Sequence, residues 1–305
     1  MKEYEVVIIG GGPAGLTAGL YASRYGLKTI LLERGLFGGQ IVNAREVHNY
    51  PGFPNGVSGM DLGQLMFDQA AKFGLQAETA EVTGIKSGGT GFEITLDEET
   101  IATRAVIIAT GSNYRKMGVE GEAKLTGRGV SYCATCDGFL FKNKDVAVVG
   151  GGDTAVTDAL ELSQHCKTVY VIHRRDQLRA SEIVQKAAFS AGNIKFIWNS
   201  VVDSLEGQEK LENVIIKDVK TGGTSSLGVE GVFVAIGLIP NSDLFKGFLE
   251  LDEAGNIVSG EMMHTSVPGV FTAGDIRRNS ARQVATAVGD GATAAKSAFS
   301  YLKER

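Results

Sequence analysis

The chain has 305 residues, of which 43% are hydrophobic and 21% are charged, and its net charge is −5. This composition is typical of a globular protein long enough for two domains, and it excludes a general basic surface for nucleic acid. No apolar run approaches the ~20 residues that cross a bilayer, and no secretory signal precedes the first apolar stretch. We therefore expect a cytoplasmic protein that binds neither nucleic acid nor membrane.

The first predicted elements form a β-turn-α-β unit. Residues 6–9 are a short, β-branched apolar run, which is typical of a buried parallel strand. A Gly-rich turn over 10–15, a helix over 14–25 and a strand over 29–33 follow. In this context the Gly-x-Gly-x-x-Gly pattern is a specific signal for dinucleotide binding.

The glycines of this first turn have separate roles. Gly10 permits the tight turn, Gly12 lets the backbone approach a pyrophosphate, and Gly15 lets the helix pack closely on the strand. Glu33 ends the second strand, where a carboxylate accepts hydrogen bonds from ribose hydroxyls and repels a 2′-phosphate. The first site therefore suits FAD or NAD rather than NADP. The alternative, a Gly-rich turn without a ligand, is disfavoured by the complete unit and by Glu33.

The same unit recurs later in the chain, with a strand over 145–149, a turn over 150–155, a helix over 154–165 and a strand over 168–172. Glu33 stands 23 positions after Gly10, and His173 stands 23 positions after Gly150. Equal spacing indicates a structural repeat. The second site differs in charge, because arginines follow His173 at positions 174, 175 and 179. Guanidinium groups suit a 2′-phosphate and so favour NADPH over NADH; a solvated basic face is the alternative.

The remaining elements complete two similar halves. Apolar strands over 105–111 and 231–237 each stop at a Gly, and the segments 90–96 and 211–217 alternate as in antiparallel meanders. The tail carries a strand leading to 270–275, then a helix over 283–302. We predict an α/β fold with two Rossmann-like domains of the three-layer ββα type, the NADPH domain inserted into the FAD domain. The expected boundaries are 1–113 and 243–305 for the FAD-binding domain, and 114–242 for the NADPH-binding domain with the cysteine pair.

Cys133 and Cys136 precede the second fingerprint, and their two-residue spacing suits either half a zinc site or a redox dithiol. Zinc requires two more ligands, but Cys166 and the four histidines show no metal-like pairing with the pair. A redox dithiol is therefore the better interpretation. Asp137, next to the second sulfur, is either a proton shuttle for the dithiol or a solvated turn residue. Cys166 is expected to be a small core residue.

Several motifs occur in the order found in one family: 131–138 around the cysteines, 150–155, 173–180, Gly38 to Gln40, 49–52, Thr272 to Asp275 and Arg282 to Val284. Together they resemble the low-molecular-weight bacterial thioredoxin reductases, which are FAD- and NADPH-dependent pyridine nucleotide disulfide oxidoreductases. The resemblance runs from residue 5 to about 300.

The resemblance implies cofactor sites position by position. FAD would be bound by Gly10, Gly12, Ala14, Gly15, Glu33, Gly39, Gln40, Asn49, Gly111, Gly274, Asp275, Arg282, Gln283 and Val284. NADPH would be bound by Gly152, Asp153, Thr154, His173, Arg174, Arg175 and Arg179.

It also implies the catalytic roles. Cys136 would lie nearest the flavin, Cys133 would attack the disulfide of a thioredoxin partner, and Asp137 would handle the proton. The family works as a homodimer whose NADPH domain swings, and segments near 112–118 and 240–245 would form the hinge.

Two departures from the family pattern are His48, before Asn-Tyr-Pro-Gly, and Asp158 on the second helix. Rival functions are a flavin-dependent dithiol oxidase, a ferredoxin-fed reductase, an NADPH sensor, and a reductase of a different thioredoxin-like partner. The first two need no NADPH and are disfavoured by the intact second fingerprint. The sensor gives the Cys-x-x-Cys-Asp segment no purpose. Relatives that reduce peroxidases carry an additional N-terminal redox domain, whereas this sequence starts at the first fingerprint.

Overall fold

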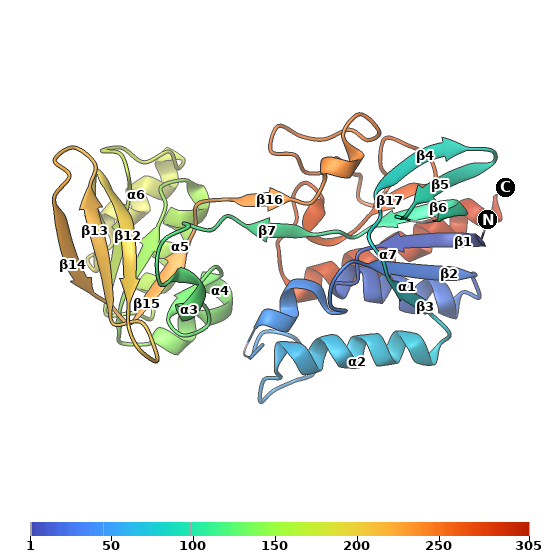
Figure 1. The fold of residues 1–305 in the computed structure, drawn as a ribbon. Coiled ribbons are helices and arrows are strands. Elements are labelled where there is room, and N and C mark those ends of the chain that lie inside the picture. The colour runs from blue at the N-terminus through green and yellow to red at the C-terminus, as the bar shows by residue number, and fades with distance from the viewer. Residues whose placement is uncertain (1, 45, 98, 305) are drawn as a thin grey trace. The chain divides into compact units, whose positions relative to one another are not determined.

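The structure is a computed structural model, and it describes residues 2–44, 46–97 and 99–304. The chain divides into two compact units: the first comprises Met1–Asn113 with Ile239–Arg305, and the second is Tyr114–Leu238. Two short strands, β7 (Ser112–Tyr114) and β16 (Leu238–Pro240), pair where the chain leaves and re-enters the first unit (Figure 1). The second unit is therefore an insertion in the sequence of the first.

The return to the first unit takes place at Ile239, whereas the predicted boundary lies after residue 242. The backbone N–H of Asn241 donates to the Gly111 carbonyl at 3.0 Å, and its side-chain amide donates to the Thr110 carbonyl at 2.8 Å. These hydrogen bonds tie Asn241 to the end of a strand of the first unit.

The first unit is built on a seven-stranded sheet in the order β3-β2-β1-β6-β5-β4, with β17 paired to the second half of β6. The strands β1, β2, β3, β6 and β17 are parallel, and β4 and β5 are antiparallel. The strands are β1 (Lys2–Ile9), β2 (Thr29–Glu33), β3 (Gln76–Thr79), β4 (Gly84–Gly88), β5 (Gly91–Thr95), β6 (Thr100–Ile108) and β17 (Val270–Thr272).

Helices α1 and α7 pack against each other on one face of this sheet (Figure 1). The helices of the first unit are α1 (Pro13–Arg24), α2 (Gly59–Lys72) and α7 (Val284–Lys303), with short 3-10 turns η1 (Gly39–Asn43), η3 (Asp243–Phe245) and η4 (Gly274–Ile276).

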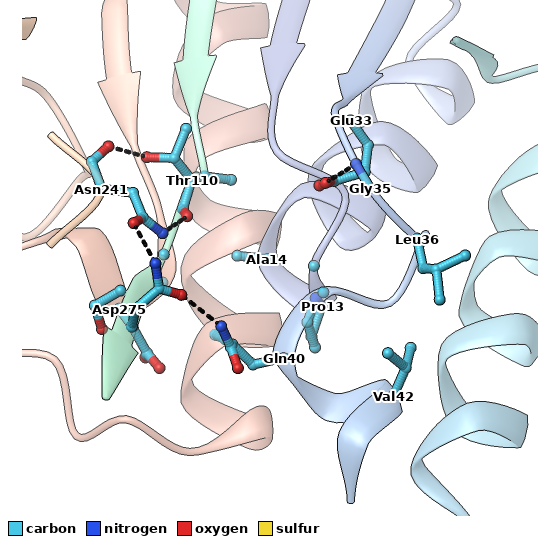
Figure 2. Close-up of a pocket in the computed structure, with 18 of the residues that line it drawn as sticks. Pro13, Ala14, Glu33, Gly35, Leu36, Gln40, Val42, Thr110, Asn241 and Asp275 are labelled. Atoms are coloured by element: carbon cyan, nitrogen blue, oxygen red, sulfur yellow. Dashed lines mark hydrogen bonds between the residues drawn. The ribbon is translucent and has the colours of Figure 1, made fainter. Parts of the chain in front are cut away.

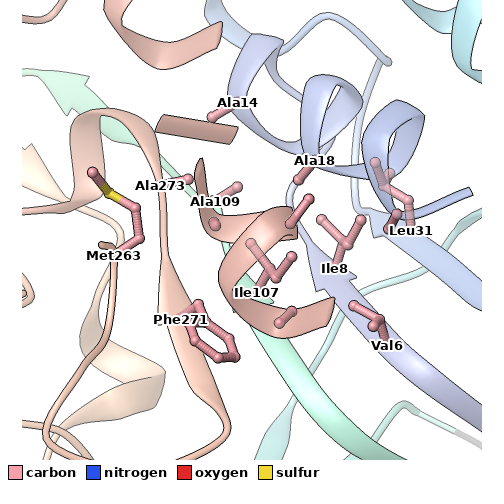
Figure 3. Close-up of a cluster of buried hydrophobic side chains, with 14 of the residues drawn as sticks. Val6, Ile8, Ala14, Ala18, Leu31, Ile107, Ala109, Met263, Phe271 and Ala273 are labelled. Carbon is pink, nitrogen blue, oxygen red and sulfur yellow. The ribbon is translucent and has the colours of Figure 1, made fainter. Parts of the chain in front are cut away.

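The alternating faces of β1 explain why the second half of its sequence is continuously apolar. Val6 and Ile8 belong to the core under the helices, together with Phe271 (Figure 3). Val7 and Ile9 belong to a second core on the opposite face of the sheet. Because both faces are covered, no polar residue interrupts the second half of the strand.

The second unit repeats this plan. Its two strand layers are a parallel sheet in the order β11-β10-β9-β15-β8 and an antiparallel sheet in the order β12-β13-β14. Val146 and Val148 belong to the core shared with α5, whereas Ala147 and Val149 belong to the core shared with the antiparallel sheet. The strands are β8 (Val130–Ser131), β9 (Asp145–Val149), β10 (Thr168–Ile172), β11 (Ile194–Ile197), β12 (Ser200–Glu206), β13 (Asn213–Asp218), β14 (Thr224–Gly228) and β15 (Gly231–Val234).

The helices of the second unit are α3 (Glu122–Leu125), α4 (Ala134–Asp137), α5 (Asp153–Ser163) and α6 (Glu182–Ser190), with the 3-10 turn η2 (Gly138–Phe141).

The predicted α/β fold with two Rossmann-like, three-layer units is confirmed. β1 begins earlier than predicted because Lys2–Tyr4 pair with residues 101–103 of β6. In the described residues, no helix has the length and apolar character needed to cross a membrane.

The contact between α1 and α7 predicts a matched pair of glycine variants on one helix. A Cβ on Gly291 would collide with the carbonyl oxygen of Ala14, whereas a Cβ on Gly289 would have no neighbour within 4 Å. We expect Gly291→Ala to lower the free energy of unfolding by about 1–3 kcal/mol, since α1 and α7 must separate. Gly289→Ala should leave it unchanged or raise it by up to ~1 kcal/mol, because alanine is the better helix former.

Urea unfolding followed by circular dichroism checks both variants. Equal stability of Gly291→Ala and Gly289→Ala would contradict the close packing of the two helices.

Candidate functional site

The turn between β1 and α1 leaves an open space at the start of the helix. Gly10 has φ 108°, and a Cβ on Gly15 would collide with the Gly10 carbonyl oxygen. A Cβ on Gly12 would instead point into space, with its nearest heavy atom, the Cα of Gly39, 4.0 Å away. None of the side chains that the structure describes caps the N-terminus of α1. Its first N–H groups are therefore available to an anionic group.

A cavity of about 350 Å³ opens at this helix N-terminus (Figure 2). This volume lies within the range of ~300–1,000 Å³ that is usual for small-molecule sites. It is lined by eight of the residues predicted to bind FAD: Gly12, Ala14, Glu33, Gly39, Gln40, Gly111, Gly274 and Asp275. All of them belong to the first unit, although they come from both of its sequence segments.

Glu33 is held in a fixed position at the edge of this cavity. Its Oε2 accepts the N–H of Gly11 at 2.6 Å, and its Oε1 accepts the N–H of Gly35 at 2.8 Å. Because each carboxylate oxygen can accept two hydrogen bonds, both retain capacity for ribose hydroxyls. The open turn and this carboxylate fit the pyrophosphate and ribose of an adenine dinucleotide such as FAD.

A chain of side-chain amides lines the opposite side of the cavity (Figure 2). Gln40 Nε2 donates to Asn113 Oδ1 at 2.7 Å, and Asn113 Nδ2 donates to Asn241 Oδ1 at 2.9 Å. Asn113 and Asn241 were not predicted from the sequence. The available signal was their position, since each stands a few residues after an apolar strand that stops at a Gly, namely Gly111 and Gly237.

Asp275 lies half-buried at the cavity wall, where burial raises the pKa of its carboxyl group. The Ser280 hydroxyl donates to Asp275 Oδ1 at 2.9 Å and opposes this shift. The preceding Gly274 donates its N–H to Asp290 Oδ2 at 3.1 Å, and Arg277 Nη2 donates to Asp290 Oδ1 at 2.9 Å. The buried Asp290 therefore fixes the turn that presents Asp275, a role that was not predicted.

The other predicted FAD residues lie outside the cavity lining. Gly10 and Gly15 form the floor of the turn. Asn49 Nδ2 donates to Gln283 Oε1 at 3.0 Å, and Gln283 caps α7, which begins at Val284. Arg282, with φ 57°, precedes this cap. The structure thus brings 49 and 282–284 together at the start of α7.

In the second unit, the turn before α5 is open in the same way. Gly150 has φ 151°, and a Cβ on Gly152 would have no neighbour within 4 Å. Asp153 and Thr154 begin α5 and are exposed. Asp153 Oδ1 accepts the N–H of Ser181 at 2.8 Å, and this hydrogen bond holds the pKa of Asp153 below its usual value.

His173 lies beneath this turn, and only 4% of its surface is exposed. A Cβ on Gly151 would collide with its ring, and its Nε2 lies 3.0 Å from the Gln177 carbonyl oxygen. Burial, with the positive charges of nearby arginines, holds the pKa of His173 below its usual value. The His173 side chain therefore supports the turn from below.

Arg174, Arg175 and Arg179 are exposed beside His173. Within the described part of the chain, their guanidinium groups form no ion pair. The backbone N–H of Arg179 donates to the Gly151 carbonyl at 2.7 Å. This bond fixes the arginine segment to the Gly-rich turn, so the basic groups stand next to an open helix N-terminus.

Cys133 and Cys136 form a disulfide with a Cα–Cα distance of 5.2 Å. Cys133 is the N-cap residue of α4, and the Cys136 N–H lies 3.2 Å from its sulfur. Cys166 is buried, and burial raises the pKa of its thiol to about 11. The half-buried Cys133 and Cys136 can therefore take part in thiol–disulfide exchange, whereas the buried Cys166 contributes to core packing.

Asp137 ends α4 and lies half-buried next to the disulfide segment. Burial raises the pKa of its carboxyl group, and a hydrogen bond from Ser131 opposes the shift. Ser131 was not among the predicted site residues. No grouping of three or more metal-ligating side chains occurs among residues 2–44, 46–97 and 99–304.

Comparisons with known proteins agree with this geometry. A sequence profile of the pyridine nucleotide-disulphide oxidoreductases matches residues 4–291. The chain is 46% identical to thioredoxin reductase of Listeria innocua, covering 99% of this chain and 95% of that protein. It is 44% identical to thioredoxin reductase of Bacillus subtilis, covering 99% and 96%.

Among solved structures, thioredoxin reductase from Streptococcus pyogenes superimposes with a TM-score of 0.95 at 43% identity, covering 99% of both chains. The family profile and these full-length relatives lead to one assignment. The chain belongs to the pyridine nucleotide-disulphide oxidoreductase family.

Proposed function

We propose that the chain is an NADPH- and FAD-dependent thioredoxin reductase, the activity named for its relatives at 44–46% identity. The observation that carries the proposal is a disulfide, Cys133–Cys136, in the same unit as an open Gly-rich turn with three exposed arginines. The overall reaction consumes NADPH, one proton and the disulfide of a thioredoxin, and yields NADP⁺ and two thiols.

The first unit holds FAD. The N-terminus of α1, where Gly12 leaves room, would hold its pyrophosphate, and Glu33 would hold its ribose. Polar groups for the rest of the cofactor come from Asp275, Gln40, Asn113 and the start of α7. Bound FAD would supply the two-electron relay between nicotinamide and disulfide.

The second unit holds NADPH. The start of α5, with Gly152, Asp153 and Thr154, takes the pyrophosphate, and Arg174, Arg175 and Arg179 surround the 2′-phosphate. His173 supports the turn from below. Among residues 2–44, 46–97 and 99–304, no acidic side chain forms an ion pair with these exposed guanidinium groups, which supports this role.

The reduced cysteines then pass two electrons to the partner. The Cys133 thiolate, favoured by the N–H of Cys136, attacks one sulfur of the partner disulfide and forms a mixed disulfide. The Cys136 thiolate attacks the Cys133 sulfur, restores the Cys133–Cys136 disulfide and releases the second partner thiol. Asp137 moves the proton that these steps exchange.

We further propose that the enzyme acts as a homodimer in the cytoplasm. Met60 and Leu65 on α2 are large apolar side chains with 53% and 51% of their surface exposed, which supports burial in an assembly. A reducing compartment suits an enzyme that makes thiols. A different thioredoxin-like partner is the remaining alternative, whereas the arginines of the second unit disfavour an NADPH-independent oxidase.

Cys133→Ser should separate cofactor reduction from partner reduction. We expect anaerobic NADPH to bleach the flavin absorbance as in the unmodified protein, while thioredoxin reduction falls at least 1,000-fold because the attacking thiolate is lost (~4 kcal/mol at ~1.4 kcal/mol per tenfold).

The matched control is Cys166→Ser, since that thiol is buried and its pKa lies at about 11. It should reduce thioredoxin at the normal rate. Normal thioredoxin reduction by Cys133→Ser would show that the sulfur assignment is wrong.

Replacing both Arg174 and Arg175 by alanine should erode the preference for NADPH. Each loses a charge-assisted contact with the 2′-phosphate of ~1.5–3 kcal/mol, so together they lose ~3–6 kcal/mol, and we expect KM for NADPH to rise by roughly 100-fold or more. The KM for NADH, which has no such phosphate, should stay the same.

Lys186→Ala removes an exposed charge from the same unit, where Lys186 lies 3.8 Å from Glu182, and should change neither value. An unaltered NADPH:NADH ratio in the double arginine variant would refute the 2′-phosphate site.

A further inference from the structure

The hydroxyl group of Ser131 lies between the backbone of Cys133 and the carboxyl group of Asp137. It donates to Asp137 Oδ2 at 2.6 Å and accepts the backbone N–H of Cys133 at 3.1 Å. Ser131 ends β8, where it pairs with Phe233 of β15, and only 6% of its surface is exposed. A rigid sheet therefore fixes the position of this hydroxyl.

The hydrogen bond from Ser131 affects the pKa of the Asp137 carboxyl group. Burial raises the pKa of Asp137, and the Ser131 hydrogen bond is what lowers it again. The helix packed against α4 is α5, which carries three further carboxyl groups, Asp153, Asp158 and Glu161. Glu161 accepts the Thr135 hydroxyl at 3.0 Å, and burial together with Glu161 raises the pKa of Asp158 to about 6. The η2 turn that follows Asp137 has the sequence Gly-Phe-Leu-Phe and contributes no charge.

Reduction of the Cys133–Cys136 disulfide requires an acid. Cleavage of the S–S bond by two electrons leaves two sulfurs that take up two protons, of which the hydride of NADPH accounts for one. The second proton must come from a protein group or solvent. A protonated, half-buried carboxyl at the end of the disulfide helix can supply it, provided that its orientation is fixed.

We propose that Ser131 is a positioning residue that aims the Asp137 carboxyl at the dithiol and couples it to the Cys133 backbone. The inference rests on the proposed function, because it assigns a partner to the proposed acid. The Ser131 hydroxyl oxygen contacts both the carboxyl group of Asp137 and the N–H of Cys133, and it also lies 3.3 Å from the Cys133 carbonyl oxygen. Loss of the hydroxyl frees the carboxyl to rotate and leaves that N–H without its partner.

The direction of the expected pH shift follows from which protonation state of Asp137 donates the proton. The acid form of Asp137 is the donor, so the rate of dithiol formation falls as pH rises through the pKa of this group. Ser131 stabilises the carboxylate, and its removal raises this pKa. We expect Ser131→Ala to move the falling limb of the pH–rate profile upward by about one pH unit and to lower the plateau roughly tenfold, because the acid is no longer aimed.

The experiment is anaerobic rapid mixing of the FAD-loaded protein with NADPH across pH, with thiols counted after acid quench. A second readout uses no nucleotide: iodoacetamide alkylation of the dithiothreitol-reduced protein across pH, in which the inflection due to Asp137 should move in the same direction. Ser131→Thr and Ser131→Val form an isosteric pair, so the first should restore the limb and the second should match Ser131→Ala, independently of any packing change.

Two control variants test whether other polar groups near Asp137 contribute to the pH dependence. Thr135→Val removes a hydroxyl that bonds to Glu161, and Asp158→Asn removes the other carboxyl with a raised pKa. Neither should shift the limb. In an Asp137→Asn background, Ser131→Ala should add nothing, because both changes act through one carboxyl.

An unshifted limb in Ser131→Ala, combined with its loss in Asp137→Asn, would overturn this inference alone. Additive effects of the two substitutions would do the same. An unchanged limb in Asp137→Asn would overturn the role of Asp137 and this inference together, while leaving the sulfur and nucleotide assignments to their own tests.

Discussion

The structure depends on one steric constraint that occurs twice: a strand must turn directly into a helix without a side chain in the way. In the first unit, Gly10 has φ 108° and a Cβ on Gly15 would collide with its carbonyl oxygen. In the second unit, Gly150 makes the turn with φ 151°, and Ala155 takes the position of the third glycine. Both turns leave the middle glycine, Gly12 or Gly152, facing open space. That space at a helix N-terminus is the feature on which each proposed nucleotide site rests.

The two copies then diverge at the end of the next strand, and the proposed assignment of FAD and NADPH to separate units rests on this divergence. Glu33 is oriented by two backbone N–H groups and keeps acceptor capacity. His173, at the same offset, is turned inward beneath Gly151, and the residues after it expose three guanidinium groups. One scaffold therefore presents a carboxylate in the first unit and a cationic surface in the second, for which we propose ribose hydroxyls and a phosphate as ligands.

Much of the fold could be predicted from the sequence because the strands are buried on both faces and are bounded by Gly-rich turns. The strands over 29–33, 145–149 and 168–172 have the predicted bounds. The early start of β1 was missed, because Lys2–Tyr4 alternate in character and gain their structure only by pairing with β6.

The predicted site residues were those with a local pattern, such as the glycines of the turns and the cysteine pair. The residues that were missed act through contacts that sequence spacing does not encode. Asn113 and Asn241 meet across 128 positions, and Asp290 reaches the turn at Gly274 from within α7. Ser131 was inside a recognised motif, but its bond to Asp137 depends on how α4 folds back toward β8.

In the proposed reaction, the electron pair rests on Cys133 and Cys136 before it leaves the protein. Mass-spectrometric mapping of thiols after anaerobic treatment with excess NADPH detects this intermediate state. We predict that both cysteines become alkylated while Cys166 stays unlabelled, and that oxidised thioredoxin reverses the labelling. Reduction of thioredoxin while Cys133 and Cys136 remain joined at every time point would contradict the account.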